Sequence, residues 1–358
     1  MRREVIHVIT SLERGGAENH LNILIREQVR QGYIVSVVVL KGRIDFVSEL
    51  SSIGVRLINL TSLSILVQIW NLRRKYLFEA LIHSHLPRAE IVSWLSMLGR
   101  GNKWIVSRHN SEKFWPRMPW FISTPISRII LGRTSFVIAI SKEVERYLKD
   151  SREISQKNYH KIRVVLYGIP LNSKKNFAQI LKPFKYRVGT AARLEPQKDI
   201  STLLKSFYIL RNRSNQEWRL SIAGSGSLLD QLQEEVLKLG LSESVSFLGK
   251  VENMEVFYEG IDIFVLSSKY EGFGLVLLEA MIKNIPIISS DIPTSKEVLG
   301  DEYPAFFPKG DPYNLARLIG SMMDENFRSK ACFAYENRLP QFNSLRMADS
   351  ISKLYQLA

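Results

Sequence analysis

The chain has 358 residues, of which 45% are hydrophobic and 23% charged. This length favours two domains with separate cores, and the composition is that of a globular protein. No segment approaches the roughly 18 uninterrupted apolar residues of a membrane span, and the first apolar run is too short for a signal peptide, so we expect a cytoplasmic protein. The single cysteine, Cys332, excludes a disulfide within the chain and a cysteine-based zinc site.

The positive net charge of +14 is concentrated in the first half of the chain. Residues 1–175 hold 28 Lys and Arg against 13 Asp and Glu, a difference of +15, whereas residues 176–358 hold 21 against 22, a difference of −1. This asymmetry indicates that the first half meets an anionic surface or substrate. Acidic lipid, nucleic acid and phosphate all fit that description.

Apolar stretches of strand length alternate with amphipathic stretches of helix length, the pattern of parallel sheets covered by helices on both faces. The pattern begins with a strand at 4–10, a loop at 11–16, a helix with apolar residues from Ala17 to Val29, and a strand at 34–40. Further strands are expected at 80–83, 103–107, 136–140 and 162–166. We therefore predict a Rossmann-like first domain over residues 1–175.

A second series of elements follows residues 171–186, which are rich in Lys and Asn and are predicted to form a hinge. Its strands are expected at 187–192, 218–223, 245–248, 261–267 and 285–289, and its helices at 200–212, 228–239, 254–258, 275–283 and 313–324. This predicts a second Rossmann-like domain over 176–335. Residues 336–358 carry apolar residues at helical spacing and are expected to form a helix that packs back on the first domain.

The most informative segment runs from Ser267 to Met281, between a predicted strand and a predicted helix. It places Glu271 in the loop and Glu279 in the helix, on either side of Gly272-Phe273-Gly274-Leu275. Glycines let the backbone approach a ligand closely, and the free N–H groups of a helix start suit a phosphate. With a diphosphate bound there, one carboxylate can accept hydrogen bonds from a sugar and the other from a ribose. A bare pair of glutamates arises readily by chance, so the prediction depends on the surrounding strand, glycine loop and helix.

At this segment the chain resembles the retaining GT-B glycosyltransferases of family 4, whose two glutamates separated by seven residues match Glu271 and Glu279. The resemblance covers nearly the whole chain and rests on motifs in family order: Gly15-Gly16-Ala17-Glu18, His109, Gly189-Thr190-Ala191-Ala192-Arg193 with Lys198, Ala223-Gly224-Ser225-Gly226 and Leu248-Gly249-Lys250. It implies an α/β fold of the GT-B type, with two doubly wound domains facing an interdomain cleft. It also implies transfer of a sugar from a nucleotide diphosphate with retention of configuration, without a metal or other cofactor.

The resemblance assigns roles to individual residues. Arg193 and Lys198 would hold the diphosphate, where two fixed cations can stabilise the charge that builds on the leaving group. Glu271 would be catalytic together with these two residues and His109, and His109 would contact the transferred sugar through its backbone carbonyl or a hydrogen bond. The substrate-binding residues would be Gly15, Gly16 and Glu18 in the first domain and Gly224, Gly226, Lys250, Val251, Gly272, Phe273, Gly274, Leu275 and Glu279 in the second.

Two further features of the sequence concern metal binding and the role of Tyr167. His83 and His85 share a predicted strand, but two histidines without an Asp-x-Asp motif fall short of a metal ligand set. We therefore predict no metal site. The family commonly has an asparagine where this chain has Tyr167 before Gly168, which leaves the role of that side chain open.

The acceptor is suggested by residues 113–133, where Trp and Phe interleave with Arg and Lys. Such a mixture suits a surface that lies on anionic lipid, although packing of a core helix with scattered surface charge is the alternative. Together with the basic first half, it favours a glycan linked to polyprenyl diphosphate as the acceptor, at the inner face of the cell membrane, in envelope polysaccharide assembly. A UDP-sugar is the favoured donor, with a GDP-sugar next.

Two other functions fit parts of the sequence. A nucleotide-sugar epimerase or hydrolase of GT-B shape would use the same donor site without an acceptor. A nucleic-acid-binding module would explain the basic charge and the aromatic residues. It would leave the loop around Glu271 unexplained, so we expect no nucleic-acid partner.

Overall fold

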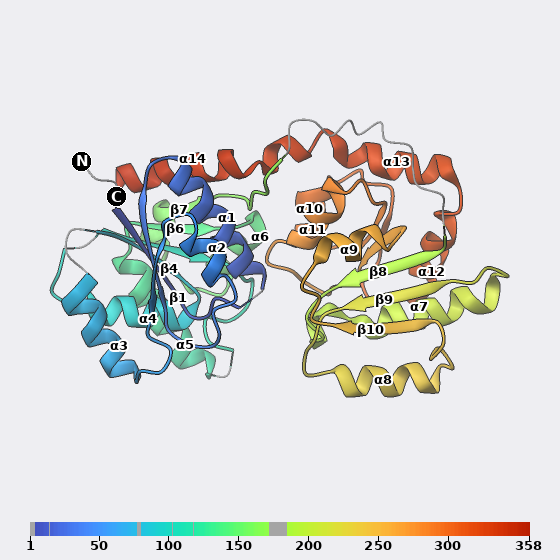
Figure 1. Cartoon of the computed structure of the whole chain (residues 1–358), viewed down its shortest axis with the longest axis horizontal. Helices are drawn as coiled ribbons and strands as arrows, with labels where there is room; N and C mark the ends of the chain where they lie inside the picture. The colour runs from blue at the N-terminus through green and yellow to red at the C-terminus, as the bar shows by residue number, and fades with distance from the viewer. Residues whose placement is uncertain (1–3, 14, 77–79, 102, 117, 172–184) are drawn as a thin grey trace. The chain divides into compact units, whose positions relative to one another are not determined.

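In the computed structural model, the described residues are 4–13, 15–76, 80–101, 103–116, 118–171 and 185–358. They divide into two compact units, Met1–Pro170 together with Gln341–Ala358, and Leu171–Pro340 (Figure 1). The predicted domain boundary between residues 175 and 176, and most of the predicted hinge, lie outside the described residues. Each unit is a parallel sheet flanked by helices.

The first unit is built on seven parallel strands in the order β3-β2-β1-β4-β5-β6-β7. Their bounds are β1 (Glu4–Ile9), β2 (Ile34–Val39), β3 (Arg56–Asn59), β4 (Leu81–His85), β5 (Trp104–Arg108), β6 (Phe136–Ala139) and β7 (Ile162–Val164). The order reverses between β1 and β4, as in doubly wound sheets. The loops that leave these two strands therefore lie side by side at one edge of the sheet.

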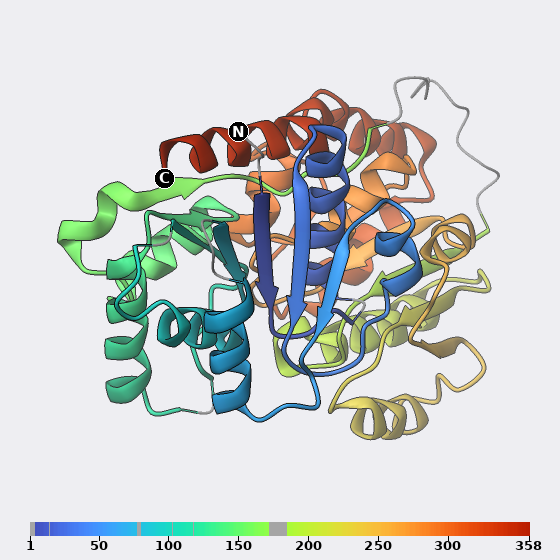
Figure 2. The ribbon, with the colours of Figure 1, turned by 60° about the vertical axis from the view of Figure 1, so that its left-hand side comes forward.

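Seven α-helices of the described residues accompany this sheet: α1 (Gly16–Arg30), α2 (Val47–Ser51), α3 (Ile65–Asn71), α4 (Pro87–Ser96), α5 (Trp120–Arg133), α6 (Lys142–Asp150) and α14 (Ser344–Leu357). The last helix packs beside α1 (Figures 1 and 2) and places Met347 and Ile351 in the core of the unit. It is tied on by a backbone bridge between Ile169 and Asn343. The end of the chain thus completes the core of the first unit.

The second unit has six parallel strands in the order β10-β9-β8-β11-β12-β13. Its strands are β8 (Arg187–Ala191), β9 (Arg219–Ala223), β10 (Val245–Gly249), β11 (Ile263–Leu266), β12 (Ile287–Ser290) and β13 (Phe306–Phe307). Its α-helices are α7 (Ile200–Arg213), α8 (Leu229–Lys238), α9 (Met254–Glu259), α10 (Leu275–Ile282), α11 (Pro293–Leu299), α12 (Pro312–Ser321) and α13 (Glu325–Glu336). Here the strand order reverses between β8 and β11.

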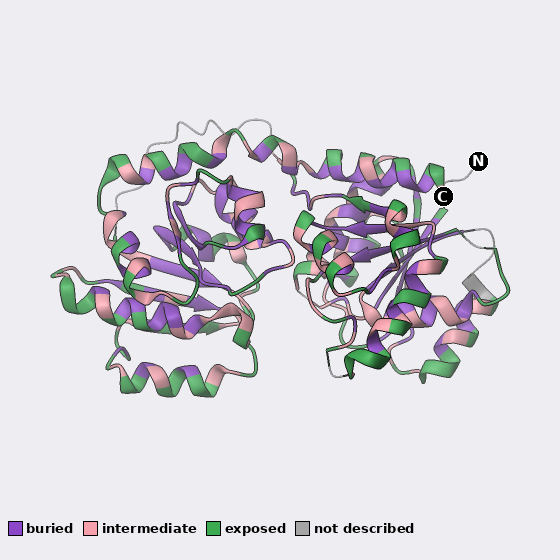
Figure 3. Ribbon diagram, turned by 180° about the vertical axis from the view of Figure 1, so that it is seen from behind, coloured by how far each residue is buried: buried purple, intermediate pink, exposed green. Residues whose placement is uncertain are grey.

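The central strands of both sheets are buried along almost their whole length (Figure 3). In β2, with the sequence Ile-Val-Ser-Val-Val-Val, only the first residue is exposed. Strands covered by helices on both faces need such continuous apolar runs, which is why the sequence located them to within about two residues. The short strands β3 and β13 had no such signal and were missed. Among the described residues, no helix combines the length and apolar character needed to cross a bilayer.

Candidate functional site

The reversal of strand order in the second sheet brings two predicted site residues into contact. Lys198 ends a short 3₁₀ turn after β8, and Glu271 lies in the loop after β11, the neighbouring strand. Ligands of open parallel sheets bind at such a switch point, beyond the carboxyl ends of the strands. Lys198 Nζ donates a hydrogen bond to Glu271 Oε1 at 2.5 Å, although the two residues are 73 positions apart.

Serine hydroxyls hold both members of this ion pair in place. Ser268 Oγ donates to the same Glu271 Oε1 at 2.6 Å, and Ser267 Oγ donates to the backbone oxygen of Lys198 at 2.8 Å. From the next strand, Ser290 Oγ donates to the backbone oxygen of Ser268 at 2.6 Å. The side chains of Lys198 and Glu271 are only 13% and 9% exposed. A cation and a carboxylate are therefore fixed at the strand ends in a poorly hydrated setting, where charge interactions are strong.

Helix α10 begins directly beyond Glu271. Gly274 precedes it in the left-handed region, at φ 89°, and as the N-cap residue it makes no side-chain hydrogen bond to the helix. Phe273 and Leu275 are buried and fasten the loop to the unit, whereas Gly272 is half-buried. The helix start therefore presents backbone N–H groups next to the ion pair, which is an arrangement that favours an anion.

Glu279, the second glutamate of the motif, lies in a different environment. It accepts a hydrogen bond from Tyr258 Oη at 2.8 Å. Burial raises the pKa of Glu279, while the bond from Tyr258 lowers it, and burial raises the pKa of Tyr258 well above its ordinary value. Tyr258 comes from α9, and no motif in the sequence pointed to it.

The remaining predicted residues of the second unit lie at the ends of neighbouring strands. Arg193 and Lys250 are exposed, after β8 and β10 respectively. Val251 lines a pocket of about 210 Å³ together with residues of β9, β10, α9 and the turn before β11, namely Ser221, Leu248, Asn253, Val256, Phe257, Gly260 and Ile261. This pocket and the ion pair belong to the same unit.

Gly224 and Gly226 have a role within the protein itself. A Cβ atom on Gly224 would lie 1.8 Å from the backbone oxygen of Ala192, and one on Gly226 would lie 2.4 Å from that of Leu194. Gly224 also has a φ of 132°, which side-chain-bearing residues rarely adopt. The turn after β9 therefore needs glycine to approach the loop after β8. The glycines of the motif assigned to the nucleotide are therefore needed for the fold, whether or not a ligand binds.

Replacing Gly224 by alanine is expected to lower the free energy of unfolding by about 3 kcal/mol or more, because the loop after β8 must move. Gly240→Ala is the matched control. Gly240 also has a positive φ, 64°, but an added Cβ would meet no atom within 4 Å, so the cost should be about 1 kcal/mol. Thermal and urea unfolding of the two variants measure the difference. Equal losses would contradict the close approach seen here.

In the first unit, the predicted first loop lies at the switch point between β1 and β4. Glu18, in the first turn of α1, accepts a hydrogen bond from Ser11 Oγ at 2.9 Å and folds back over Gly15. Gly16 is exposed, and a Cβ atom on it would meet nothing within 4 Å. The space in front of its backbone would admit a ligand.

His109 follows β5 and is buried, with 8% exposure. Its Nε2 lies 3.1 Å from His85 Nδ1, and its Nδ1 is hydrogen-bonded to Tyr167 Oη. Tyr167 in turn stacks on His20 of α1, with ring centroids 3.9 Å apart. Burial, and secondarily Arg108, lowers the pKa of His109 to about 3, so the ring is neutral. The sequence signalled Tyr167 only as a departure from the family pattern, and it gave no sign of His20.

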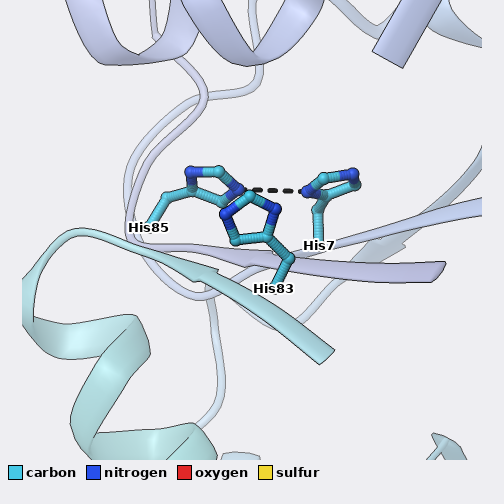
Figure 4. Close-up of side chains that lie close together, drawn as sticks. All are labelled: His7, His83 and His85. Atoms are coloured by element: carbon cyan, nitrogen blue, oxygen red, sulfur yellow. Dashed lines mark hydrogen bonds between the residues drawn. The ribbon is translucent and has the colours of Figure 1, made fainter. Parts of the chain in front are cut away.

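Three histidines, His7, His83 and His85, lie close together in the first unit (Figure 4), and they contact Gln28 of α1 and Tyr355 of α14. His7 lies on β1 beside His83 on β4, and His85 is two residues further along β4, on the same face of the sheet. Their ligand nitrogens all lie within 4.8 Å of one another, and all three side chains are fully buried. The sequence pointed to His83 and His85 as possible metal ligands, but not to His7. Only the pairing of β1 with β4 adds the third ring, and three rings are the usual minimum for a histidine metal site.

A buried charge cluster fixes the segment that follows His109. Arg108 lies 2.9 Å from Glu90 of α4 and 2.8 Å from Glu153, and it also donates to Ser127 of α5 at 2.8 Å. Burial raises the pKa of Glu90 to about 7, although Arg108 acts against this shift. Glu153 further accepts from the backbone N–H of Phe114. The cluster thereby anchors α5 and the loop before it to the sheet.

Large apolar side chains stand exposed on α3 and α5, two helices that both pack against α4. On α5 the exposed fractions are 67% for Trp120 and 61% for Phe121. On α3 they are 75% for Leu66 and 50% for Trp70, over which Arg74 lies at 5.2 Å. We call these two helices the α3/α5 surface. The sequence predicted the part on α5, whereas α3 was not among the predicted helices.

Two family models together match most of the chain. The model for glycosyltransferase family 4 matches residues 14–173, and the model for glycosyl transferases group 1 matches residues 172–338. The chain belongs to the family 4 glycosyltransferases. This agrees with the resemblance based on the motif of Glu271 and Glu279.

Individual members of this family are distant from the chain in sequence. The lipopolysaccharide core biosynthesis mannosyltransferase LpcC of Rhizobium leguminosarum bv. viciae is 26% identical over 181 residues, which cover 49% of this chain and 50% of LpcC. The GalNAc-alpha-(1->4)-GalNAc-alpha-(1->3)-diNAcBac-PP-undecaprenol alpha-1,4-N-acetyl-D-galactosaminyltransferase of Campylobacter jejuni is 25% identical over 276 residues, 76% of this chain and 73% of that protein. The chain thus matches only half the length of LpcC.

Solved structures of the family share the fold. HepE of Anabaena, determined in complex with UDP and glucose, superposes with a TM-score of 0.83, at 16% identity and over 100% of both chains. At this identity the likeness concerns the fold alone. The predicted α/β fold of GT-B type, with two Rossmann-like domains, is confirmed.

Proposed function

We propose that this family 4 member is a metal-independent, retaining glycosyltransferase that moves a sugar from a nucleotide diphosphate to a lipid-linked glycan. In this proposal the C-terminal domain, residues 176–335, binds the donor, and the N-terminal domain, residues 1–175, binds the acceptor. The observation that carries it is the contact between Lys198 and Glu271 at the switch point of the second sheet, next to the start of α10. A diphosphate bound at that helix start lies within reach of Lys198 and leaves Glu271 beside the attached sugar.

The chemistry follows from these charges. The acceptor hydroxyl forms a bond to the anomeric carbon on the face from which the diphosphate departs, the bond from that carbon to the phosphate oxygen breaks, and a β-phosphate oxygen takes the hydroxyl proton. The nucleoside diphosphate leaves with the bonding electrons. Lys198 and Arg193 stabilise its growing negative charge, and Glu271 orients the sugar through its hydroxyls. No nucleophile of the enzyme is required.

The proposed substrates are supported by the relatives. HepE was solved with UDP and glucose, which favours a UDP-sugar over a GDP-sugar as the donor. The name of the Campylobacter jejuni relative describes an acceptor on undecaprenol diphosphate, and LpcC is named for lipopolysaccharide core biosynthesis. A polyprenyl-diphosphate-linked acceptor in envelope polysaccharide assembly is therefore the proposal for this chain.

Such an acceptor lies at a membrane, and the α3/α5 surface suits contact with one. Exposed Trp and Phe side chains insert at the level of the lipid headgroups, while Arg128 and Arg133, exposed on α5, attract anionic lipid. The net charge of +15 over residues 1–175 acts in the same direction. We therefore propose a cytoplasmic protein bound peripherally to the inner face of the cell membrane.

Flotation with lipid vesicles tests this attachment. We expect the protein to float at low salt with vesicles that contain phosphatidylglycerol and much less with pure phosphatidylcholine, and added salt should weaken the binding. Replacing Trp70 and Trp120 by serine should reduce binding by about tenfold. Leu237→Ser with Phe333→Ser, which removes two equally exposed apolar residues from the second unit, should leave it unchanged. Equal binding to both kinds of vesicle would contradict the proposal.

Incubation of the protein with nucleotide-sugars, with and without a lipid-linked acceptor extract, tests the activity itself. We expect release of nucleoside diphosphate to require the acceptor, with the sugar recovered in the lipid fraction. Isomerised donor would instead show an epimerase, and release of free sugar without acceptor would show a hydrolase. If the donor is unchanged and the protein retains oligonucleotides, the nucleic-acid-binding alternative replaces the enzyme.

A further inference from the structure

A continuous chain of hydrogen bonds runs through the core of the first unit and ends at His109. From Gln28 of α1 it passes to His7 at 2.8 Å, from His7 to His85 at 3.0 Å and from His85 to His109 at 3.1 Å. Tyr167 closes this end by its bond to His109. Each of the three rings uses both of its nitrogens, so every ring is both a donor and an acceptor.

A second branch leaves Gln28 toward the C-terminal helix. Gln28 Nε2 donates to Tyr355 Oη of α14 at 3.0 Å. Tyr355 Oη lies 2.6 Å from His83 Nδ1, and His83 Nε2 lies 2.7 Å from Ser107 Oγ. Gln28 therefore joins α14 to the histidines that lead to His109.

The orientation of the Gln28 amide fixes the protons of the branch that leads to His109. Its Oε1 can only accept, so His7 must carry its proton on Nε2 and accept on Nδ1. His85 must then donate from Nε2 to His7 Nδ1, and His109 from Nε2 to His85 Nδ1. This leaves His109 Nδ1 to accept from the Tyr167 hydroxyl. On the other branch, Tyr355 has its oxygen occupied by Gln28 and donates to His83 Nδ1. All bonds are satisfied by neutral rings of one tautomer.

We propose that Gln28, His7 and His85 are positioning residues that hold the His109 ring in the Nε2–H tautomer through one directed hydrogen-bond chain, which also ties it to Tyr355 of the C-terminal helix. The consequence for catalysis rests on the proposed function: the ring of His109 has neither a proton nor a lone pair to offer, so residue 109 meets the sugar through its backbone. Hydrogen bonds that run in one direction polarise each other, so the chain holds His109 more firmly than isolated pairs would.

The same bonds argue against a metal at His7, His83 and His85. A cation would need a lone pair from each ring, but His85 Nε2 carries the proton that it donates to His7, and His83 Nδ1 accepts from Tyr355. Metal binding would break both bonds and reverse the tautomer of His85, which would release His109. The directed chain and the metal site therefore exclude each other.

Nuclear magnetic resonance of protein with ¹⁵N-labelled histidine tests the chain, because the nitrogen shifts show which ring nitrogen carries the proton. We expect the Nε2–H form for His7, His83, His85 and His109. In Gln28→Glu the carboxylate still accepts from His7, so His7, His85 and His109 keep their tautomer. The carboxylate cannot donate to Tyr355, so the Tyr355 hydroxyl turns to donate to it, and His83, which loses this donor, changes alone. In Gln28→Met the acceptor is lost, and the signals of His7, His85 and His109 change together.

Gln68→Met is the matched control, because Gln68 is an equally buried glutamine of the same unit that bonds to backbone oxygens instead. It should leave the four histidine signals as they are. In the transfer assay, we expect Gln28→Met to lower kcat by about tenfold with a smaller change in KM, since a misplaced residue 109 affects the transition state most. Gln28→Glu should restore most of that loss.

Four outcomes would overturn the proposal. Two come from the spectra: Nδ1–H tautomers, or signals of His85 and His109 that do not change in Gln28→Met. The other two are an unchanged kcat in Gln28→Met, and one zinc or other transition metal ion per purified chain that is lost in His83→Gln. The tautomers, the response of the histidine signals and the metal content are independent of the proposed chemistry, whereas kcat is not. If the tautomers are as expected but no nucleotide-sugar is turned over, the proposed function fails while the hydrogen-bond chain stands.

Discussion

Lys198→Met is expected to lower kcat for sugar transfer by about 100-fold or more, because one of two cations that stabilise the leaving diphosphate is removed. The variant should also bind UDP alone about tenfold more weakly, a change of about 1.4 kcal/mol in binding free energy. Methionine keeps most of the length of the side chain, and Ser268 still donates to Glu271. The loss should therefore reflect the missing charge more than a rearranged loop.

Glu271→Gln separates the two partners of the ion pair. We expect a similar fall in kcat, since the sugar loses its charged partner, but UDP binding that is unchanged or tighter, because Lys198 is released from its 2.5 Å bond to Glu271. Calorimetric titration with UDP measures this contrast, and kcat is measured with the donor found in the transfer assay. Breaking a buried pair also costs stability, so circular dichroism and the melting temperature must show that each variant is folded.

Lys238→Met is the control for the removal of a lysine from the second unit, because Lys238 forms an exposed ion pair with Glu234 on α8. It should change neither kcat nor UDP affinity. Weaker UDP binding in Glu271→Gln than in Lys198→Met would show that the carboxylate, and not the lysine, meets the nucleotide. Full turnover by both variants would remove the basis of the proposed function.

The second unit was the more predictable half of the site, for a physical reason. Residues that follow buried parallel strands must lie at one edge of the sheet, so the motifs around Lys198 and Glu271 could be placed there from sequence. Lys198 and Glu271 touch because β11 pairs with β8, and the local sequence pattern does not predict the order of strands in a sheet. Gly224 shows that a motif residue can be explained without a ligand. It was assigned to ligand binding, but the close approach of the Ala192 backbone already requires a glycine at this position.

The first unit was harder to predict because its polar core is assembled from distant strands. His7 and His83 are neighbours only through the pairing of β1 with β4. A signal was present, since polar rings interrupt two otherwise apolar strands at positions that face the same side. Helix α3 was not predicted: its residues from Ile65 to Trp70 are mostly apolar, yet most of them are exposed. Apolar composition cannot distinguish a core from a surface that another molecule covers.

Acidification from pH 7.5 to 5.5 is expected to destabilise the protein, chiefly through its five buried histidines. Burial lowers the pKa of His7 to about 4 and that of His109 to about 3, and it holds those of His20, His83 and His85 well below the ordinary value of 6.5. The unfolded chain takes up protons below about pH 6.5 and the folded chain does not, so stability is complete above that pH and falls as the pH drops toward the folded values.

The size of the effect follows from linkage. His7 and His109, with folded pKa values of about 4 and about 3, each cost about 1.3 kcal/mol between pH 7.5 and 5.5. His20, His83 and His85 add losses of the same sign. Burial raises the pKa of Glu90 to about 7, so this group acts in the opposite direction and stabilises the folded state by about 2 kcal/mol over the same pH interval. Glu279, whose pKa is also raised, adds to this opposing effect. The expected net effect is a loss of stability toward pH 5.5, because five buried histidines oppose two carboxyl groups.

Urea unfolding at pH 7.5, 6.5 and 5.5 and constant ionic strength measures this dependence, and two histidine variants assign it. His20→Phe keeps a ring stacked on Tyr167 and removes a side chain whose Nδ1 has no hydrogen-bond partner among the described residues. It should therefore reduce the pH dependence of stability. His160→Gln, at an exposed position, should leave it unchanged. A urea midpoint that is constant or rises toward pH 5.5 would mean that the buried rings are protonated in the folded state, and the neutral chain that ends at His109 could not exist in that form.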